Sequence, residues 1–352
     1  MPNPTHGVLP FIKIGAAVGA VALAFAFTAG WLTPERLSPD QIVDSLEQRG
    51  GDPTGHRRNH AKGICFTGYF EANGAGTRLS KAAIFATGRY PVIGRFAIAT
   101  GDPVAADATG RVRSMAIRVV APNGEEWRSG MNAMPVFPVA TVEEFYQLTL
   151  AQDIDPKTGK PDPMAIPRFA ASHPAVGVFA QWAATAPWTS SYADQSYYGL
   201  NAFRFVDAQG ASHAVRWVMV PATPAETIAQ ADLAALGPDF LSTDLKDRVQ
   251  KGELRWTLVA TLGSPTDPTN DVTKVWPADR EQVELGALVI QAAQDEANGP
   301  CRDYNYDPLI LPPGIEPSDD PLLAARSAAY AESFDRRAAE ADHYPRTKGA
   351  GQ

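Results

Sequence analysis

The sequence predicts an α+β protein built around an antiparallel β-sheet, either open or closed into a barrel. Three observations support this class. Short runs of β-branched and aromatic residues recur, several of them alternating with polar residues in the two-residue period of strands. Turn signals separate these runs. Segments with helical patterns interrupt them and follow the last of them.

The bulk composition is that of a globular protein. Of the 352 residues, 45% are hydrophobic and 20% charged, which excludes a disordered chain and a fibrous repeat. The 31 basic and 39 acidic side chains give a net charge of −8, so nucleic acid is not expected as a partner. The two cysteines, Cys65 and Cys301, are too few for a four-thiolate zinc site. The sequence leaves open whether the two cysteines form one disulfide or are two separately buried thiols.

The N-terminal segment differs from the rest of the chain. Ile14 to Leu32 is a run of 19 residues without a charge, which as a helix would rise roughly 28 Å, about the thickness of a bilayer core. Lys13 and no acidic residue precede it, so the positive-inside bias predicts a transmembrane helix with the following domain extracytoplasmic, or periplasmic in a Gram-negative cell. A cleaved signal peptide, with small residues at 28–30, and a buried core helix are the alternatives.

The strands are expected between about residue 63 and residue 262. Turn signals at 122–124 and 207–210 stand where hairpin loops would be. The four clearest strand runs are 95–99, 115–120, 202–206 and 214–220. The helical patterns cover 141–152, 224–250 and 280–294.

A C-terminal helix is predicted to begin at residues 318–321, which offer capping side chains and then proline, and to run to about residue 341. Arg326 and Tyr330 are four residues apart on it, and Arg337 lies seven residues further, so the three share one face. One interpretation is a solvated face. The other is that Arg326 contacts the Tyr330 oxygen and lowers the phenol pKa from about 10, so that the oxygen can ligate a metal.

A second cluster, residues 57–63, contains one histidine, His60, followed by Ala-Lys-Gly. Without further motifs, this histidine could be an ordinary surface or core residue instead of a functional one. Further motifs follow in order: Leu-Ser-Lys at 79–81, Pro-x-x-x-Arg-Phe at 91–96, Asn-x-x-Pro-x-Phe at 132–137, Pro-Pro-Gly-Ile-Glu at 312–316 and Arg-x-x-x-Tyr at 326–330. In order and spacing these motifs resemble the catalase superfamily, over roughly residues 57–337. The chain is most similar to the small catalase-related peroxidases, because it is shorter than a typical catalase at both ends.

The resemblance implies a haem b protein with a catalase-like antiparallel eight-stranded β-barrel and flanking helices, the haem lying between the barrel and the C-terminal helix. Position by position, His60 and Asn132 would be the catalytic distal residues. Tyr330 would be the axial iron ligand, held by Arg326.

The remaining family positions concern cofactor binding. Arg57, Arg95 and Arg337 match positions that bind haem propionates, a task that suits planar, bidentate guanidinium groups. Phe145 falls where a haem-stacking phenylalanine is found, although a core phenylalanine is the alternative at this position. We therefore expect the chain to be divided into four parts: an anchor or signal peptide at 1–33, a linker at 34–56, a catalase-like haem domain at 57–345 and a disordered tail at 346–352.

Two residues depart from the family pattern. Typical catalases have Ser or Thr after Arg-Phe, where this chain has Ala97, so a hydrogen bond that orients His60 is expected to be missing. Asn59 stands where typical catalases have valine, which would make the approach to the iron more hydrated. No match to the nicotinamide-binding positions of large catalases is present, so no NADPH is expected.

The expected function is therefore a haem peroxidase. It would reduce H₂O₂ or organic hydroperoxides with an external small-molecule electron donor, through His60-assisted cleavage of the O–O bond at a Tyr330-ligated iron. A true catalase that dismutates H₂O₂ is the main alternative. A non-catalytic, membrane-tethered haem-binding protein and an enzyme that rearranges fatty-acid hydroperoxides are the others.

Overall fold

The computed structural model describes residues 9–28, 37–49, 51–223 and 225–346. The predicted tail at 346–352 lies outside these ranges except for residue 346. The helices are α1 (Leu9–Thr28), α2 (Pro39–Glu47), α3 (Val142–Leu150), α4 (Ala165–Ala170), α5 (Pro174–Thr185), α6 (Gln230–Leu233), α7 (Phe240–Lys251) and α8 (Pro321–Ala339).

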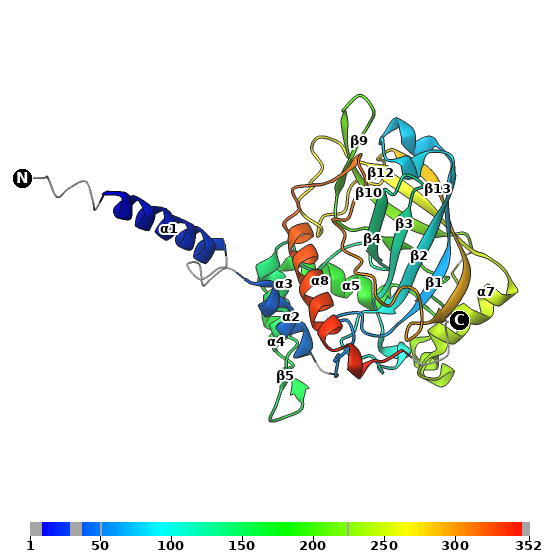
Figure 1. The fold of residues 1–352 in the computed structure, drawn as a ribbon. Helices are drawn as coiled ribbons and strands as arrows, with labels where there is room; N and C mark the ends of the chain where they lie inside the picture. Colours follow the sequence, from blue (N-terminus) through cyan, green and yellow to red (C-terminus); the bar gives the residue numbers. More distant parts are fainter. Residues whose placement is uncertain (1–8, 29–36, 50, 224, 347–352) are drawn as a thin grey trace, which may run out of the picture.

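The main sheet closes into a barrel of eight antiparallel strands within the described residues (Figure 1), as the family resemblance implied. Around the ring the strands are β12 (Leu254–Leu262), β13 (Gln282–Asp295), β1 (Gly63–Ala72), β2 (Gly88–Ile98), β3 (Arg113–Val120), β4 (Glu126–Asn132), β8 (Tyr197–Tyr198) and β10 (Ser212–Pro221). The pairing of β10 with β12 closes the ring.

In the described ranges, six short strands lie outside the ring. β9 (Phe203–Val206) pairs with β10, and β14 (Ile315–Pro317) pairs with β9. The other four form two isolated pairs, β5 (Ile154–Asp155) with β6 (Lys160–Pro161) and β7 (Trp188–Thr189) with β11 (Thr227–Ile228). All four predicted strand runs fall on strands, namely β2, β3, β9 and β10.

The prediction of a helix at 280–294 is wrong, because this segment is strand β13. It hydrogen-bonds to β12 on one side and to β1 on the other. The register to β12 shifts opposite Leu285 and Gly286, and such a bulge interrupts the two-residue alternation by which a strand is identified from sequence. Pairing along both edges of β13 then determines that this segment is a strand, even where its local sequence favours a helix.

The other helix predictions fare better. The structure confirms the helix predicted at 141–152 as α3, and the C-terminal helix as α8. The region 224–250 is not one helix: Gly237, with φ +91°, and Pro238 separate α6 from α7, since glycine allows the left-handed turn and proline lacks the N–H of a continuing helix. Residue 224 lies outside the described part.

The transmembrane anchor predicted at 14–32 is not supported. Helix α1 covers Leu9–Thr28 of the described residues. No helix in the described part of the chain combines the length and the hydropathy needed to cross a membrane. Residues 29–32 of the predicted anchor lie outside the described residues.

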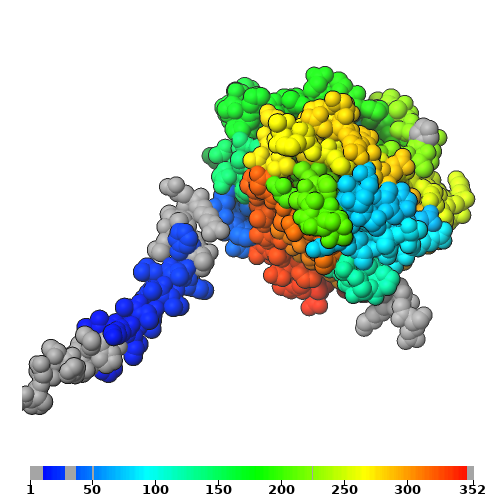
Figure 2. Space-filling view, turned by 90° about the horizontal axis from the view of Figure 1, so that it is seen from above, coloured from blue at the N-terminus to red at the C-terminus, as the bar shows by residue number. Residues whose placement is uncertain are grey.

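Helix α8 lies against the outside of the barrel and is held there in part by α2 (Figure 1). Figure 2 shows the blue segment that contains α2 beside the orange C-terminal segment. Ser38 caps α2 in a capping box with Gln41, and Arg336 of α8 pairs with Asp44 of α2 at 2.7 Å. The segment 34–56, expected to be a linker, therefore contains a helix that packs on the domain.

Candidate active site

A cavity lies between the outer face of β2, β3 and β4 and the helix α8. Because side chains alternate along a strand, cross-strand neighbours form two rows on this outer face. The rows are Arg95–Ala116–Gly130 and Ala97–Ser114–Asn132. Four of these six residues are Gly, Ala or Ser, so this wall of the cavity is shallow and leaves room for a flat ligand. At Gly130 an added Cβ would lie 3.2 Å from Arg326 Nη2 and 3.7 Å from Tyr330 Oη.

All eight site residues predicted from the sequence line this cavity. It holds about 1440 Å³ of space outside protein atoms, a figure that includes space open to solvent. Barrel strands, α3 and α8 contribute to the lining together. The eight residues are Arg57, His60, Arg95, Asn132, Phe145, Arg326, Tyr330 and Arg337.

His60 and Asn132 are joined through a residue that the sequence reasoning missed, Ser114. The Ser114 hydroxyl donates to Asn132 Oδ1 at 2.6 Å and lies 3.1 Å from His60 Nδ1. Its single hydrogen is used toward Asn132, so the contact with His60 requires a proton on Nδ1. The His60 Nε2 is then unprotonated and free to accept a proton.

Ser114 also supplies the hydrogen bond that Ala97 was expected to remove. The two residues are cross-strand partners on β2 and β3, so their side chains lie side by side on the same face. A hydroxyl absent from one strand is thus present on the neighbouring strand. The register of the sheet, which the sequence does not reveal, makes this exchange possible.

The backbone of His60 has φ +57°, and that of Leu200 has φ +48°. These are the two residues other than glycine with positive φ in the described ranges, and both line the cavity. Left-handed backbone costs energy in residues with a Cβ and is concentrated at functional sites. The Asn59 side chain supports this conformation, since its Oδ1 accepts from the His60 N–H at 3.0 Å.

The pKa of His60 falls to about 3. The main cause is loss of solvation of the imidazolium in the cavity, and repulsion by the guanidinium groups of Arg95 and Arg326 adds to it. The imidazole is therefore neutral at physiological pH, as a proton acceptor must be.

Tyr330 is held by a hydrogen-bond relay that begins inside the protein. Arg326 Nη2 donates to Tyr330 Oη at 3.1 Å, and Arg326 Nη1 donates to Asn201 Oδ1 at 2.5 Å. Asn201 Nδ2 donates in turn to Asp320 Oδ2 at 2.8 Å, and Asp320 is also the N-cap of α8. The guanidinium is thus fixed beside the phenol oxygen of Tyr330.

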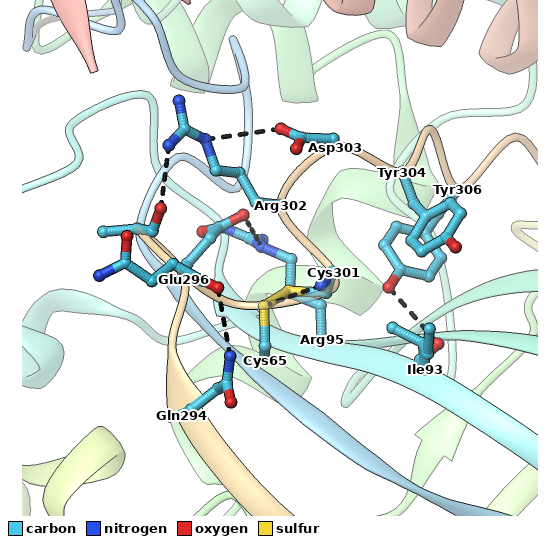
Figure 3. Close-up of a disulfide and its surroundings, with 12 residues drawn as sticks. Cys65, Ile93, Arg95, Gln294, Glu296, Cys301, Arg302, Asp303, Tyr304 and Tyr306 are labelled. Carbon is cyan, nitrogen blue, oxygen red and sulfur yellow. Dashed lines mark hydrogen bonds and ion pairs between the residues drawn. A yellow bond between two sulfur atoms is a disulfide. The ribbon is translucent and has the colours of Figure 1, made fainter. Parts of the chain in front are cut away.

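At another part of the lining, Arg57, Arg95 and Arg337 form a cationic cluster. Behind it lies the buried carboxylate of Glu296, which pairs with Arg57 and Arg95. Next to Glu296 is a disulfide between Cys65 and Cys301 (Figure 3), which settles the alternative left open by the sequence.

Phe145 stacks on Phe137, with ring centroids 6.2 Å apart, and both line the cavity.

Three of the contributing residues, Ser114, Asn201 and Glu296, were missed because none stands in a recognisable motif. Ser114 occurs in an ordinary strand, Asn201 lies in a bend and Glu296 lies in a turn. Asp320 was predicted only as a helix-start residue. Ser114, Asn201 and Glu296 can be found only from the three-dimensional structure, where each bonds to a residue that the motifs identify.

Comparison with known proteins gives consistent matches over almost the whole chain. Residues 26–344 match the family model described as Catalase. A catalase-related peroxidase of Synechococcus elongatus is 36% identical, the match covering 92% of this chain and 93% of that protein. A catalase-related peroxidase of Mycolicibacterium paratuberculosis is 30% identical, covering 86% and 95%.

Solved structures share the fold at lower identity. A fungal catalase has a TM-score of 0.72 at 23% identity, with 80% of this chain and 59% of that chain covered. A bacterial catalase has a TM-score of 0.73 at 22% identity, covering 84% and 60%. The present chain thus spans about three fifths of these longer proteins.

Proposed function

The chain belongs to the catalase family and is a haem peroxidase of it, and from this premise we propose how its residues act and on which substrates. The proposed reaction is reduction of H₂O₂ or an organic hydroperoxide by an external small-molecule electron donor. One observation carries this proposal: the eight residues identified by motif or by family position line one cavity, in which His60 and Asn132 share the Ser114 hydroxyl.

The residues of the cavity fit haem b. The shallow wall of small side chains suits a flat macrocycle, and the arginine cluster suits its two carboxylates. The Tyr330 oxygen, with Arg326 beside it, would hold the iron. When bound, the haem supplies the oxidation and reduction chemistry.

His60 acts as the proton carrier in this proposal. Its Nδ1 keeps a proton through Ser114, and its Nε2 takes the proton from the incoming peroxide and returns it to the oxygen that leaves as water or alcohol. Its low pKa keeps it in the accepting form before the peroxide arrives.

Asn132 orients the peroxide. Its Oδ1 already accepts from Ser114, so its Nδ2 hydrogens are the groups available to a peroxide oxygen. An uncharged, fixed donor of this kind stabilises charge on that oxygen without giving up a proton.

Peroxidase turnover is proposed to exceed dismutation. Dismutation needs a second H₂O₂ to arrive before any other donor, which a long, narrow channel favours. The relatives that this chain matches over 93% and 95% of their own length are named catalase-related peroxidases, which supports this order of the two activities.

An extracytoplasmic location is also part of the proposal. A disulfide persists in oxidising compartments and is rare in the cytosol. The bond between Cys65 and Cys301 is buried within the domain, as expected of a structural disulfide.

The cofactor assignment is tested with Tyr330→Phe, which keeps the ring but cannot bind iron. We expect this variant to lose haem or bind it far more weakly, as measured by its visible spectrum after purification. Tyr69→Phe, on β1 beneath the Arg89 guanidinium, is the matched control and should keep its haem. A Tyr330→Phe protein with the wild-type ferric spectrum would show that another side chain holds the iron.

A further inference from the structure

The carboxylate of Glu296 lies behind the arginine cluster and outside the cavity wall. Arg57, Arg95 and Arg337 line the cavity, whereas Glu296 does not. Glu296 is 6% exposed. Its Oε1 accepts from Arg95 Nε at 2.8 Å and from Arg57 Nη1, and its Oε2 accepts from Arg95 Nη2 at 2.6 Å. The two guanidinium groups are therefore oriented by one buried carboxylate.

The chain after Glu296 holds the other side of the cluster. Arg57 Nη2 donates to the carbonyl oxygens of Cys301, Arg302 and Tyr304, at 3.0 to 3.2 Å. Arg337 donates to two of the same carbonyl oxygens, those of Arg302 and Tyr304. A single segment, residues 296–304, thus supplies both the carboxylate and the carbonyl groups that fix these arginines.

The disulfide ties this segment to the barrel at the level of the cluster. Cys65 on β1 is the cross-strand partner of Arg95 on β2, and it is bonded to Cys301. The segment passes so close that an added Cβ at Gly299 would lie 2.4 Å from Cys65 Sγ. Figure 3 shows Glu296 directed to Arg95 beside the disulfide.

The charges in the cluster do not cancel. Three guanidinium groups and one carboxylate leave a net charge of +2. Among the described residues, no carboxylate lies within ion-pair distance of Arg337, whose guanidinium donates to backbone carbonyls instead. Burial together with repulsion from Arg57 lowers the pKa of Arg337 to about 9. The net charge of +2 is equal and opposite to the charge of two carboxylates on one edge of a ligand.

We propose that Glu296 is a positioning residue, fixed by the Cys65–Cys301 disulfide, that aligns Arg57 and Arg95 toward the cavity and sets the cluster to receive a ligand edge with two carboxylates. The proposal rests on the proposed propionate-binding roles of the arginines. Without Glu296, two buried cations repel each other with no shared anion, and their guanidinium groups turn away from the cavity.

The test compares two cofactors that differ only at this edge. Wild-type protein, Glu296→Gln and the control Glu284→Gln are reconstituted with haem or with its dimethyl ester, in which both carboxylates are blocked. Glu284 is an exposed residue on β13, the strand that leads to Glu296. The rate of cofactor loss to excess apomyoglobin is measured, which requires no catalytic turnover.

We expect wild type and Glu284→Gln to lose the ester faster than haem. In Glu296→Gln the loss of haem should accelerate by about tenfold or more, equivalent to ~1.4 kcal/mol, while the loss of the ester stays within about twofold. Equal acceleration for both cofactors would mean a general structural role and would overturn the proposal. An unchanged rate of haem loss in Glu296→Gln would overturn it as well.

One outcome separates this proposal from the proposed function. If wild-type protein binds haem but loses both cofactors at the same rate, the arginines do not bind carboxylates, and the role of Glu296 fails while the peroxidase assignment stands. Should Glu296→Gln not fold, Cys65→Ala/Cys301→Ala serves instead, because it frees the same segment. The same selective acceleration of haem loss is expected, and its absence contradicts the proposal.

Discussion

Ser114 shows how a single hydroxyl connects the two proposed catalytic side chains. It reaches both His60 and Asn132, and it stands beside Ala97, the position at which typical catalases have a Ser or Thr hydroxyl. Motifs identified His60, Asn132 and Tyr330 because each lies in a run of characteristic neighbours. They could not identify Ser114, because its role depends on which strand pairs with β2 and in which register.

For this reason we expect Ser114→Ala to slow peroxide consumption by about 10- to 100-fold, the usual cost of losing a group that orients a catalytic side chain. Haem content should be unchanged. The double variant Ala97→Ser/Ser114→Ala puts the hydroxyl back on the adjacent strand and should recover most of the rate in a steady-state peroxidase assay. A Ser114→Ala enzyme with wild-type activity would remove the hydroxyl from the mechanism.

The low pKa of His60 predicts a pH dependence of stability. The folded protein protonates His60 only near pH 3, whereas the unfolded chain does so near 6.5. Between these values the unfolded state binds more protons, so this contribution to stability is present above about pH 6.5 and is lost as the pH falls toward 3. His60→Gln does not titrate, so its urea midpoint should decline less over this range. Parallel declines in both proteins would contradict the assignment.

At the scale of elements, helix α8 depends on its N-cap residue, Asp320, for both stability and site geometry. Asp320 accepts from Leu322 N–H at 2.9 Å and from Asn201 at 2.8 Å. The sequence predicted this helix start because the capping residues and proline are local signals. It did not predict the bond to Asn201, which joins residues 119 positions apart.

Asp320→Ala should therefore lower the free energy of unfolding by about 1–2 kcal/mol, the range for loss of an N-cap. It should also loosen Arg326 through Asn201. Asp319→Ala removes the exposed neighbouring carboxylate and should change stability by less than about 0.5 kcal/mol. Urea unfolding compares the two variants, and equal losses would show that the cap is unimportant.

Strand β13 and helix α1 mark where local patterns mislead. In β13 a bulge obscures the alternation, and pairing with β1 and β12 decides the outcome. In α1 an uncharged run suggested a membrane span, but no helix in the described part of the chain combines the length and the hydropathy needed to cross a membrane. The error at β13 arises because a window of sequence contains no information about neighbouring strands.

At the scale of the whole molecule, the barrel and α8 place residues from distant parts of the sequence around one cavity. The ordered motifs made the fold and most of the site predictable, because they span residues 57–337. Closure of the ring through β10 and β12, the Cys65–Cys301 bond and the place of Glu296 depend on contacts across the whole chain. These features emerge only from the three-dimensional structure.

The central claim is that this chain uses its haem site mainly as a peroxidase. The most direct test follows oxygen release and oxidation of an organic electron donor together, in one reaction of the purified haem-loaded protein with H₂O₂. We predict that donor oxidation exceeds oxygen release, and that His60→Ala loses roughly two to four orders of magnitude of donor oxidation while keeping its haem. Vigorous oxygen release with negligible donor oxidation would contradict the claim and identify a true catalase.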